Sequence, residues 1–269
     1  MKFVLGIDIG SLTAKAVVLD LNSKILGSKI LPVGADPLRT TTILFDELIA
    51  KLSLTKADMT YCLSTGYGRK IAMKIFLPKD NIEQMTEISC HARGAYFLNS
   101  QIKTVIDIGG QDSKAIALNE EGFVRDFEMN DKCSAGTGRF LEVMAKALET
   151  SVEEMGELAL QSENPVSISS TCTVFAESEV ISHVAQGKDR IDILAGIHQS
   201  VATKVAGLAK RLPNIESEIM LTGGVAKNPA VKKSLEEELG YKLVLPPNPQ
   251  IVGALGAALY ALQKSKKRS

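Results

Sequence analysis

The sequence predicts an α/β protein built from two similar lobes, and three observations support this fold class. A pattern of thirteen residues occurs twice in the chain, strand-like and helix-like segments alternate, and 269 residues suffice for two domains that each bury a core. Residues 1–100 together with about 250–269 are expected to form the first lobe. Residues 101–249 are expected to form the second.

The repeated pattern is found at residues 7–19 (IDIGSLTAKAVVL) and again at residues 106–118 (IDIGGQDSKAIAL). Seven of the thirteen aligned positions are identical, including the acid, the glycine and the lysine. Each copy has the pattern of a β-hairpin: an apolar strand ends in Asp, a turn of glycine and small polar residues follows, and a second strand returns. Two copies indicate a duplicated domain and not a solenoid.

The turn of this hairpin has the chemistry of a phosphate-binding loop. Glycine lets backbone N–H groups turn toward an anion, and an Asp at a strand end can bind Mg²⁺, directly or through water, and orient an attacking water. One such turn is usually an ordinary hairpin, but a matched pair can grip one polyphosphate from two sides. We therefore predict the actin-like (ribonuclease H-like) duplicated ATPase fold, with a nucleotide cleft between its lobes. The candidate residues are Asp8, Gly10, Ser11, Leu12, Thr13 and Lys15 in the first copy and Asp107, Gly109, Gly110 and Gln111 in the second.

A third glycine signal lies at residues 220–229 (MLTGGVAKNP), after a predicted strand and before a helix that opens near Pro229. Two glycines let a flat base and ribose approach the backbone, so Gly223, Gly224 and Val225 are candidates for adenosine binding, although a tight strand-to-helix turn explains them equally simply. Residues 43–52, 140–148 and 251–260 have the spacing of packed helices. The Rossmann and P-loop glycine motifs do not occur.

The overall charge gives no sign of a nucleic-acid or membrane partner. Lysine plus arginine number 31, as do aspartate plus glutamate, and the basic tail at 264–268 is short. No apolar stretch has the length of a signal-peptide core or a membrane span, so a cytoplasmic location is expected. In that compartment the four cysteines are expected to be thiols, metal ligands or redox groups, not disulfides.

Two of the cysteines precede predicted helices. Cys133 comes immediately before the helix that continues through residue 148, and Cys172 lies between a β-like run and the acidic helix start at Glu177. A thiolate at a helix N-terminus is stabilised by the helix dipole and by N–H groups that have no partner within the helix. Both positions therefore suit an anionic cluster.

The residues after Cys133 suit an iron–sulfur cluster in particular. Gly136 and Gly138 let the backbone approach the cluster, and Ser134 and Thr137 are candidate hydrogen-bond donors to sulfur. A four-iron cubane takes four thiolates, so a symmetric dimer that donates two from each subunit satisfies the count. From spacing alone, two buried or reactive thiols are an equally good interpretation.

The other two cysteines are expected in the core. Cys62 lies in an alternating, strand-like segment at residues 59–63, and Cys90 lies in a helix-like segment at residues 88–95. His91, beside Cys90, is expected to be structural and not a metal ligand.

At these motifs the chain resembles the ATP-dependent activators of 2-hydroxyacyl-CoA dehydratases, within the wider group of benzoyl-CoA-reductase-type ATPases. The resemblance covers nearly the whole chain, and the two cysteine motifs are highly specific to it. It rests on residues 7–11 (IDIGS), 64–69 (STGYGR), 107–112 (DIGGQD), 130–140 (NDKCSAGTGRF), 170–179 (STCTVFAESE) and 222–226 (TGGVA).

The resemblance implies a homodimer with one [4Fe-4S] cluster between its subunits, ligated by Cys133 and Cys172 of each, and ATP or ADP with Mg²⁺ in each monomer. It implies an ATPase that passes single low-potential electrons to an iron–sulfur acceptor, either a 2-hydroxyacyl-CoA dehydratase or a double-cubane-cluster protein. A ferredoxin- or flavodoxin-type donor would act upstream. Helices that start near Cys133 would point their N-termini at the cluster, and closure of the lobes on ATP would reorient them.

The actin-like class suggests roles for individual residues. By this analogy Asp8 and Asp107 serve Mg²⁺ and the attacking water, Gln111 contacts the γ-phosphate or the water, and Lys15 neutralises phosphate charge. Two positions depart from the family pattern. Leu12 stands where a small hydroxyl residue is common, which puts a side-chain phosphate contact there in doubt. Residues 250–252 are more apolar than in some dehydratase activators, which leaves the acceptor open.

Two other functions, and one other arrangement of the cluster ligands, remain open from the sequence. A small-molecule kinase of the same fold would have the same two phosphate loops and no iron. A nucleotide-gated iron–sulfur scaffold or sensor would bind a cluster with negligible ATP turnover. That arrangement would use all four cysteines of one chain as ligands.

Overall fold

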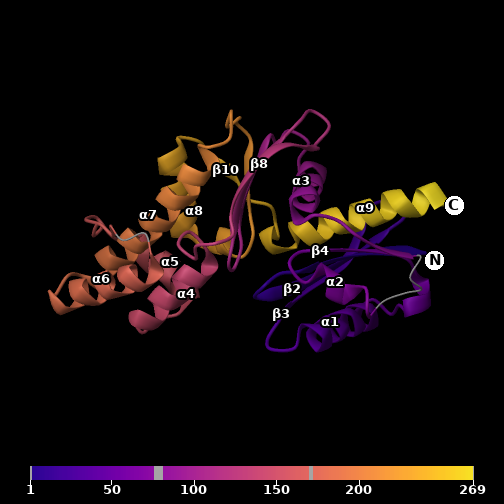
Figure 1. Cartoon of the computed structure of the whole chain (residues 1–269), viewed down its shortest axis with the longest axis horizontal. Helices are drawn as coiled ribbons and strands as arrows, with labels where there is room; N and C mark the ends of the chain where they lie inside the picture. Colours follow the sequence, from indigo (N-terminus) through magenta and orange to yellow (C-terminus); the bar gives the residue numbers. More distant parts are fainter. Residues whose placement is uncertain (1, 76–80, 170–171, 269) are drawn as a thin grey trace. The chain divides into compact units, whose positions relative to one another are not determined.

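The structure is a computed structural model that describes residues 2–75, 81–169 and 172–268. The chain divides into two compact units. The first consists of Met1–Ile102, Leu118–Arg125 and Gln250–Ser269, and the second of Lys103–Ala117 and Asp126–Pro249. Figure 1 labels the helices and some of the strands of both units.

The first unit is built on a five-stranded sheet with the strand order β3-β2-β1-β4-β5. Strands β1 and β2 form the predicted antiparallel hairpin, in which Asp8 pairs with Lys15, and β4 lies parallel to β1 with Thr65 beside Asp8. Asp8 therefore lies where the carboxyl ends of two strands meet. The elements are β1 (Phe3–Ile9), β2 (Thr13–Asp20), β3 (Ile25–Pro32), α1 (Pro37–Lys51), β4 (Met59–Thr65), α2 (Arg69–Ala72), β5 (Ile82–Gln84), α3 (Glu87–Leu98) and α9 (Val252–Arg268), with 3₁₀ turns at Lys56–Asp58 and Pro249–Ile251.

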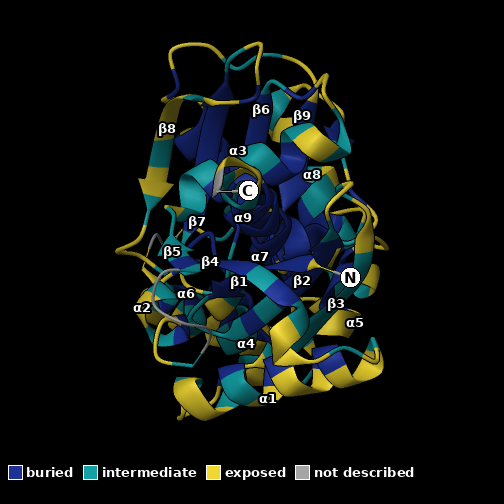
Figure 2. Cartoon of the chain, turned by 90° about the vertical axis from the view of Figure 1, so that its right-hand side faces the viewer, coloured by how far each residue is buried: buried dark blue, intermediate teal, exposed yellow. Residues whose placement is uncertain are grey.

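The two faces of this sheet are covered by different helices. Alternate side chains of a strand point to opposite faces. Leu5 and Ile7 of β1 pack in a cluster with Phe45 of α1, whereas Val4 packs in a second cluster with Leu255 of α9. The opposite side of α1 is exposed (Figure 2).

Helix α9 packs at backbone distance against its neighbours, as the glycine spacing of residues 251–260 predicts. A Cβ atom at Gly256 would lie 1.8 Å from the carbonyl oxygen of Cys90 on α3, and one at Gly6 would lie 2.1 Å from the carbonyl oxygen of Ala254. Neither position can accept a side chain without separating the helix from α3 or from β1.

The second unit repeats the plan with the strand order β10-β9-β6-β7-β8. The second predicted hairpin is formed by β6 and β7, in which Asp107 pairs with Lys114, and the parallel strand β9 places Thr222 beside Asp107. The elements are β6 (Thr104–Ile108), β7 (Ser113–Leu118), β8 (Val124–Asn130), α4 (Gly138–Ala147), α5 (Val152–Ala159), α6 (Thr173–Ala185), α7 (Arg190–Ala209), β9 (Ile219–Thr222), α8 (Pro229–Leu239) and β10 (Leu243–Val244), with a 3₁₀ turn at Val225–Lys227.

The core of the second unit gathers around α7. Its buried residues Leu194, Ile197 and Val201 belong to one cluster with Ile106 and Ile108 of β6. The edge strand β8 is mostly exposed, as Figure 2 shows. Among the helices of the described residues, none is both long enough and apolar enough to cross a membrane.

A buried histidine connects α7 to the start of α8. Nδ1 of His198 lies 2.6 Å from the carbonyl oxygen of Leu194, and Nε2 of His198 lies 2.9 Å from Nδ2 of Asn228. Asn228 caps α8, because its Oδ1 accepts from the N–H groups of Ala230 and Val231 at 3.1 Å. With that oxygen used, the amide nitrogen donates to Nε2, so His198 is neutral with its proton on Nδ1.

This arrangement predicts a stability that depends on pH. Burial lowers the pKa of His198 below its ordinary 6.5. The unfolded chain therefore binds a proton that the folded chain does not, and the free energy of unfolding decreases as the pH falls below about 6.5. We expect His198→Gln to reduce this dependence, measured by urea unfolding between pH 5 and pH 8. An equally steep dependence in the variant would assign the effect to other groups.

Candidate phosphate loops and cysteine site

The first phosphate loop is the β1–β2 turn. Its backbone is closed by a hydrogen bond from the N–H of Gly10 to the carbonyl of Thr13 at 3.0 Å, and Lys15 Nζ lies 3.2 Å from Asp8 Oδ2. Asp8 is 2% exposed, yet its Oδ1 is buried with no hydrogen-bond partner among the described residues. A buried carboxylate oxygen of this kind calls for a water or a cation as its partner.

The loop after β4 lies against the same carboxylate. Gly66 has a φ of +85°, and a Cβ atom there would lie 2.4 Å from Asp8 Oδ1. The N–H of Gly68 donates to the carbonyl of Ile9 at 2.8 Å, which attaches this loop to the end of β1. The glycines of the motif at residues 64–69 therefore make room for Asp8.

The second phosphate loop is the β6–β7 turn, closed in the same way by Gly109 N–H and the carbonyl of Asp112 at 2.9 Å. Here both oxygens of the aspartate are occupied. Lys114 Nζ lies 3.2 Å from Asp107 Oδ2, and the hydroxyl of Thr222 donates to Asp107 Oδ1 at 3.0 Å. The two aspartates of the repeat thus differ in their hydrogen bonding. Among the described residues Oδ1 of Asp8 has no partner, whereas both oxygens of Asp107 accept a hydrogen bond.

The glycine turn after β9 completes this group in the second unit. Gly223 has a φ of +89°, and a Cβ atom there would lie 2.3 Å from the carbonyl oxygen of Ile108 and 2.8 Å from Asp107 Oδ1. The structure therefore brings the predicted Gly223–Val225 segment next to Asp107. Asn228, at the end of the same turn, caps α8.

The remaining loop residues lie at the surface of their own units. Ser11, Leu12 and Thr13 are partly exposed, Gly110 is partly exposed, and Gln111 is exposed. Leu12 also accepts, through its carbonyl, a hydrogen bond from the N–H of Val33 at 2.9 Å.

The two candidate cluster cysteines lie in segments that are hydrogen-bonded to each other. The hydroxyl oxygens of Ser134 and Thr173, each the residue after a cysteine, lie 2.7 Å apart. Asn130 shapes the first segment, since its Oδ1 accepts from the N–H of Cys133 at 3.2 Å and its Nδ2 donates to the carbonyl of the same residue at 2.7 Å. Cys133 and Cys172 are both exposed. The structure therefore places two accessible thiols in adjoining loops.

Three expectations about this region were wrong. Helix α4 begins at Gly138, with Thr137 as its N-cap, so Cys133 precedes it by a full turn, and it is Cys172 that occupies a helix N-cap, that of α6. Thr137 is buried and donates its hydroxyl to the carbonyl of Ser134 at 2.7 Å, so that hydroxyl is used within the loop and does not serve a sulfur.

The third wrong expectation is the β-like run before Cys172. Residues 167–169 form no strand. Instead, Ser169 donates through its N–H at 3.0 Å and through its hydroxyl at 2.9 Å to Glu179 of α6. Ser170 and Thr171 of the motif lie outside the described residues.

Helix α4 is joined directly to the second phosphate loop. Its first N–H groups, those of Gly138 and Arg139, donate to the carbonyls of Gly109 at 2.9 Å and Gly110 at 2.8 Å. The first N–H groups of a helix have no partner within the helix, and here the phosphate loop provides one. Gly136, with a φ of +86°, lies on the short path between this contact and Cys133.

The other two cysteines differ from the exposed pair. Burial raises the pKa of the Cys90 thiol to about 12, and burial also raises the pKa of the Cys62 thiol far above its ordinary value. Both thiols are buried, and burial disfavours the thiolate form that metal ligation needs. His91 is likewise buried, with Nε2 3.9 Å from a carboxylate oxygen of Glu87 on the same helix.

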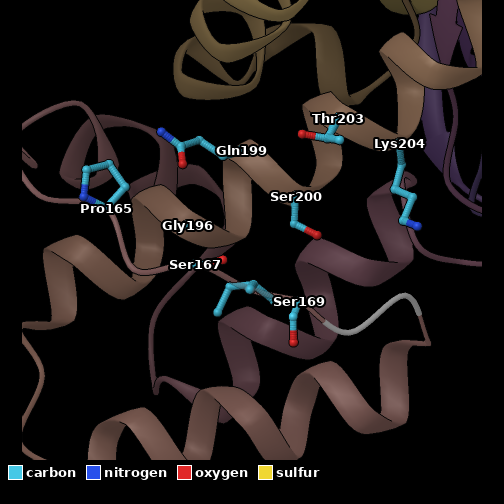
Figure 3. A pocket seen from close by; sticks show the side chains of 9 residues that line it. Pro165, Ser167, Ser169, Gly196, Gln199, Ser200, Thr203 and Lys204 are labelled. Carbon is cyan, nitrogen blue, oxygen red and sulfur yellow. The ribbon is translucent and has the colours of Figure 1, made fainter.

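A separate polar pocket of about 290 Å³ lies in the second unit (Figure 3). The chain at 165–169 forms one wall and α7 the other, and a Cβ atom at Gly196 would lie 1.8 Å from the carbonyl of Val166. Lys204 is the single charged residue among its described lining residues, which also include Ser167, Ser169, Gln199, Ser200 and Thr203. The hydroxyl of Thr203 is already used, because it donates to Glu238 at 2.7 Å.

Comparison with known proteins decides the family. The family model of the BadF/BadG/BcrA/BcrD ATPases matches residues 5–261. The chain belongs to the BadF/BadG/BcrA/BcrD ATPase family. It is 47% identical over 266 residues to the activator of lactoyl-CoA dehydratase of Anaerotignum propionicum, and the match covers 99% of this chain and 100% of the relative.

Solved structures support the assignment. Component A of the (R)-2-hydroxyglutaryl-CoA dehydratase of Acidaminococcus fermentans is similar with a TM-score of 0.93 and 47% identity, over 99% of this chain and 100% of that one. The activator of the 2-hydroxyisocaproyl-CoA dehydratase from Clostridium difficile, solved with bound ADPNP, has a TM-score of 0.91 and 42% identity, over 99% and 96%. A ROK family glucokinase from Streptomyces griseus, 14% identical with a TM-score of 0.59 over 97% and 99%, shares the fold alone. The predicted actin-like ATPase fold is confirmed.

Several residues of this BadF/BadG/BcrA/BcrD ATPase escaped the sequence analysis. Lys114 could have been found from the sequence, because it aligns with Lys15 in the repeat. Asp112 could have been found as well, because it follows Gln111 in the same motif. Asn130 and Thr173 lie inside the quoted cysteine motifs. Thr222 gave no signal beyond its place before Gly223, because its contact with Asp107 spans 115 residues.

Proposed function

We propose that this ATPase is an activator that uses ATP to drive single, low-potential electrons into an iron–sulfur acceptor protein, most directly a 2-hydroxyacyl-CoA dehydratase. Two similar proteins are described as activators of a lactoyl-CoA and of a 2-hydroxyisocaproyl-CoA dehydratase. A double-cubane-cluster protein is the other acceptor of this proposal. We place the reaction in the cytoplasm, downstream of a ferredoxin- or flavodoxin-type donor.

The observation that carries this proposal is the contact between the second phosphate loop and α4. The carbonyls of Gly109 and Gly110 hold the first N–H groups of the helix that follows Cys133. A movement of this loop on nucleotide binding therefore moves α4 directly, without an intermediate layer of side chains. A ligand shifts such an equilibrium only through contacts that differ between the two states, and the loop provides those contacts.

For the nucleotide, we propose the two predicted lobes as the clamp, with residues 1–100 and about 250–269 on one side and 101–249 on the other. Gly10, Ser11 and Thr13 of the first loop and Gly109 and Gly110 of the second present the backbone to phosphate. Lys15 neutralises phosphate charge, and the turn at Gly223, Gly224 and Val225 takes the adenosine. Leu12 contributes only backbone.

The carboxylates have separate roles in this proposal. The orphaned Oδ1 of Asp8 fits Mg²⁺, held directly or through water, and the metal when bound supplies charge neutralisation and water activation. Each oxygen of Asp107 accepts one hydrogen bond, from Lys114 or from Thr222, and keeps a further lone pair. In this proposal Asp107 therefore serves Mg²⁺, directly or through water, and orients the attacking water. Gln111, exposed in the same loop, contacts the γ-phosphate or that water.

For the redox group, we propose one [4Fe-4S] cluster per homodimer, held by Cys133 and Cys172 of each subunit. The two thiols are exposed on loops joined through Ser134 and Thr173, which fits ligands shared with a second copy. The cluster when bound supplies one-electron redox chemistry. Gly136 lets the backbone approach it, whereas Gly138 lies against Gly109 of the second phosphate loop.

The surface around Cys172 supports the dimer. Val174 and Phe175 of α6 are 65% and 68% exposed, and Ile181 on the same helix is 53% exposed. Val174 and Ile181, seven residues apart, share one face of α6, and exposed apolar side chains that share a face favour an interaction site. A symmetric pairing there places two copies of Cys172 on either side of one axis.

Iron analysis after anaerobic purification tests this function. We expect about four irons for every two chains, together with a dimer by light scattering and ATP hydrolysis that needs Mg²⁺. Four irons per chain would favour ligation by all four cysteines. No iron would refute the redox proposal and favour a kinase, and iron with negligible ATP turnover would favour a scaffold or sensor.

A further inference from the structure

The two copies of the repeated hairpin bury their lysines to different depths. The side chain of Lys15 is 15% exposed and lies 3.2 Å from Asp8. The side chain of Lys114, at the equivalent position, is 1% exposed and lies between two carboxylates, at 3.2 Å from Asp107 Oδ2 and 2.8 Å from Asp112 Oδ1. The same residue type therefore meets different electrostatic surroundings in the two loops.

The additional carboxylate arises from one position of the repeat. Asp112 stands where the first copy has Thr13, and both residues close their turn with the same backbone hydrogen bond. The carboxylate of Asp112 folds back over Gly109, where a Cβ atom would lie 2.6 Å from its Oδ1. Gly109 thus makes room for an acidic side chain, in addition to any approach to phosphate.

We infer that Lys114 and Asp112 are positioning residues for Asp107, whereas Lys15 serves phosphate charge. The ammonium of Lys114 lies between the buried carboxylate of Asp107 and the partly exposed carboxylate of Asp112, so its charge is satisfied within the protein. Lys114 fixes one oxygen of Asp107, and Thr222 fixes the other, so the carboxylate has a set orientation. This inference rests on the proposed function of Asp107 in ATP hydrolysis.

The repeat itself provides the matched comparison, namely Lys114→Met against Lys15→Met. We expect Lys114→Met to lower kcat for ATP hydrolysis about a hundredfold, because a misoriented group costs about that much, with KM for ATP and Kd for ADP within about threefold of wild type. We expect Lys15→Met to raise KM and the ADP Kd about tenfold or more. Steady-state kinetics and calorimetry with Mg²⁺ and ADP measure both.

Two results would overturn the inference, namely wild-type kcat in Lys114→Met, or a loss of ADP affinity equal to that of Lys15→Met. Lys114→Met leaves the carboxylates of Asp107 and Asp112 close together without the ammonium between them, and their repulsion could destabilise the fold. The double variant Lys114→Met with Asp112→Asn removes one of these charges. It is expected to bind ADP normally and to turn over about a hundredfold slower than wild type; wild-type turnover would refute the role of Lys114. Wild-type protein without any ATP turnover would instead refute the proposed function, which keeps the two failures apart.

Discussion

Asp8→Ala is expected to lower kcat for ATP hydrolysis by about a thousandfold while leaving the iron content of the protein unchanged. The variant removes the buried Oδ1 that we assign to Mg²⁺, and groups that stabilise charge in a transition state account for rate effects of about that size. The variant removes the carboxylate that lies 3.2 Å from Lys15 but keeps the ammonium that we assign to phosphate, so the affinity for ADP should change much less than turnover does. A phosphate-release assay and iron determination on the same preparation measure the two properties.

Asp20→Ala is the control for this experiment. Asp20 lies at the other end of β2, where its Oδ1 accepts hydrogen bonds from Asn22 and Lys24 in a surface turn. Its loss should lower stability slightly and leave kcat within about twofold of wild type. Wild-type turnover in Asp8→Ala would count decisively against the phosphate site.

Cys133→Ala is expected to remove the cluster and to weaken the dimer. One missing thiolate per subunit leaves two of four ligands, too few for a cubane that bridges the subunits. Since metal binding stabilises the assembly that provides the ligands, its loss should also raise the dissociation constant of the dimer. Iron determination, the visible absorption of the protein and analytical ultracentrifugation measure these effects.

Cys90→Ala is the matched control, because Cys90 is buried and its pKa of about 12 keeps it a thiol. It should lose some stability through its smaller side chain but keep its full iron content. A fully iron-loaded Cys133→Ala protein would refute the ligand assignment. Iron loss in Cys90→Ala without loss of the fold would favour ligands drawn from all four cysteines.

The sequence predicted those parts of the molecule that depend on local pattern. The hairpins at Asp8 and Asp107 could be predicted because strand alternation and glycine turns act over a few residues, and the repeat showed them twice. The core thiols Cys62 and Cys90 followed from the same periodicity. The family, now confirmed, rests on motifs that are likewise short.

The details of the site depend on contacts between distant residues, which periodicity does not encode. The start of α4 was placed too early because the chain after Cys133 first makes a turn, and that turn is stabilised by Asn130 and by the phosphate loop. The state of Asp107 depends on Thr222, which lies on another strand of the sheet. A one-dimensional pattern identifies such residues as polar but does not pair them.

The hydrogen bonds from α4 to Gly109 and Gly110 have a consequence for the thermodynamics of the proposed cycle. If nucleotide binding changes the reduction potential of a cluster at Cys133 through this contact, then reduction of the cluster must change the nucleotide affinity. The two changes have the same free energy, because coupling between two equilibria is reciprocal. For a one-electron couple, each tenfold difference in ADP affinity between the oxidised and reduced protein equals a shift of about 59 mV in reduction potential. Calorimetry of ADP binding to the oxidised and to the reduced protein would thus measure the coupling between nucleotide binding and the reduction potential of the cluster. In this proposal that coupling passes through the two carbonyls of Gly109 and Gly110.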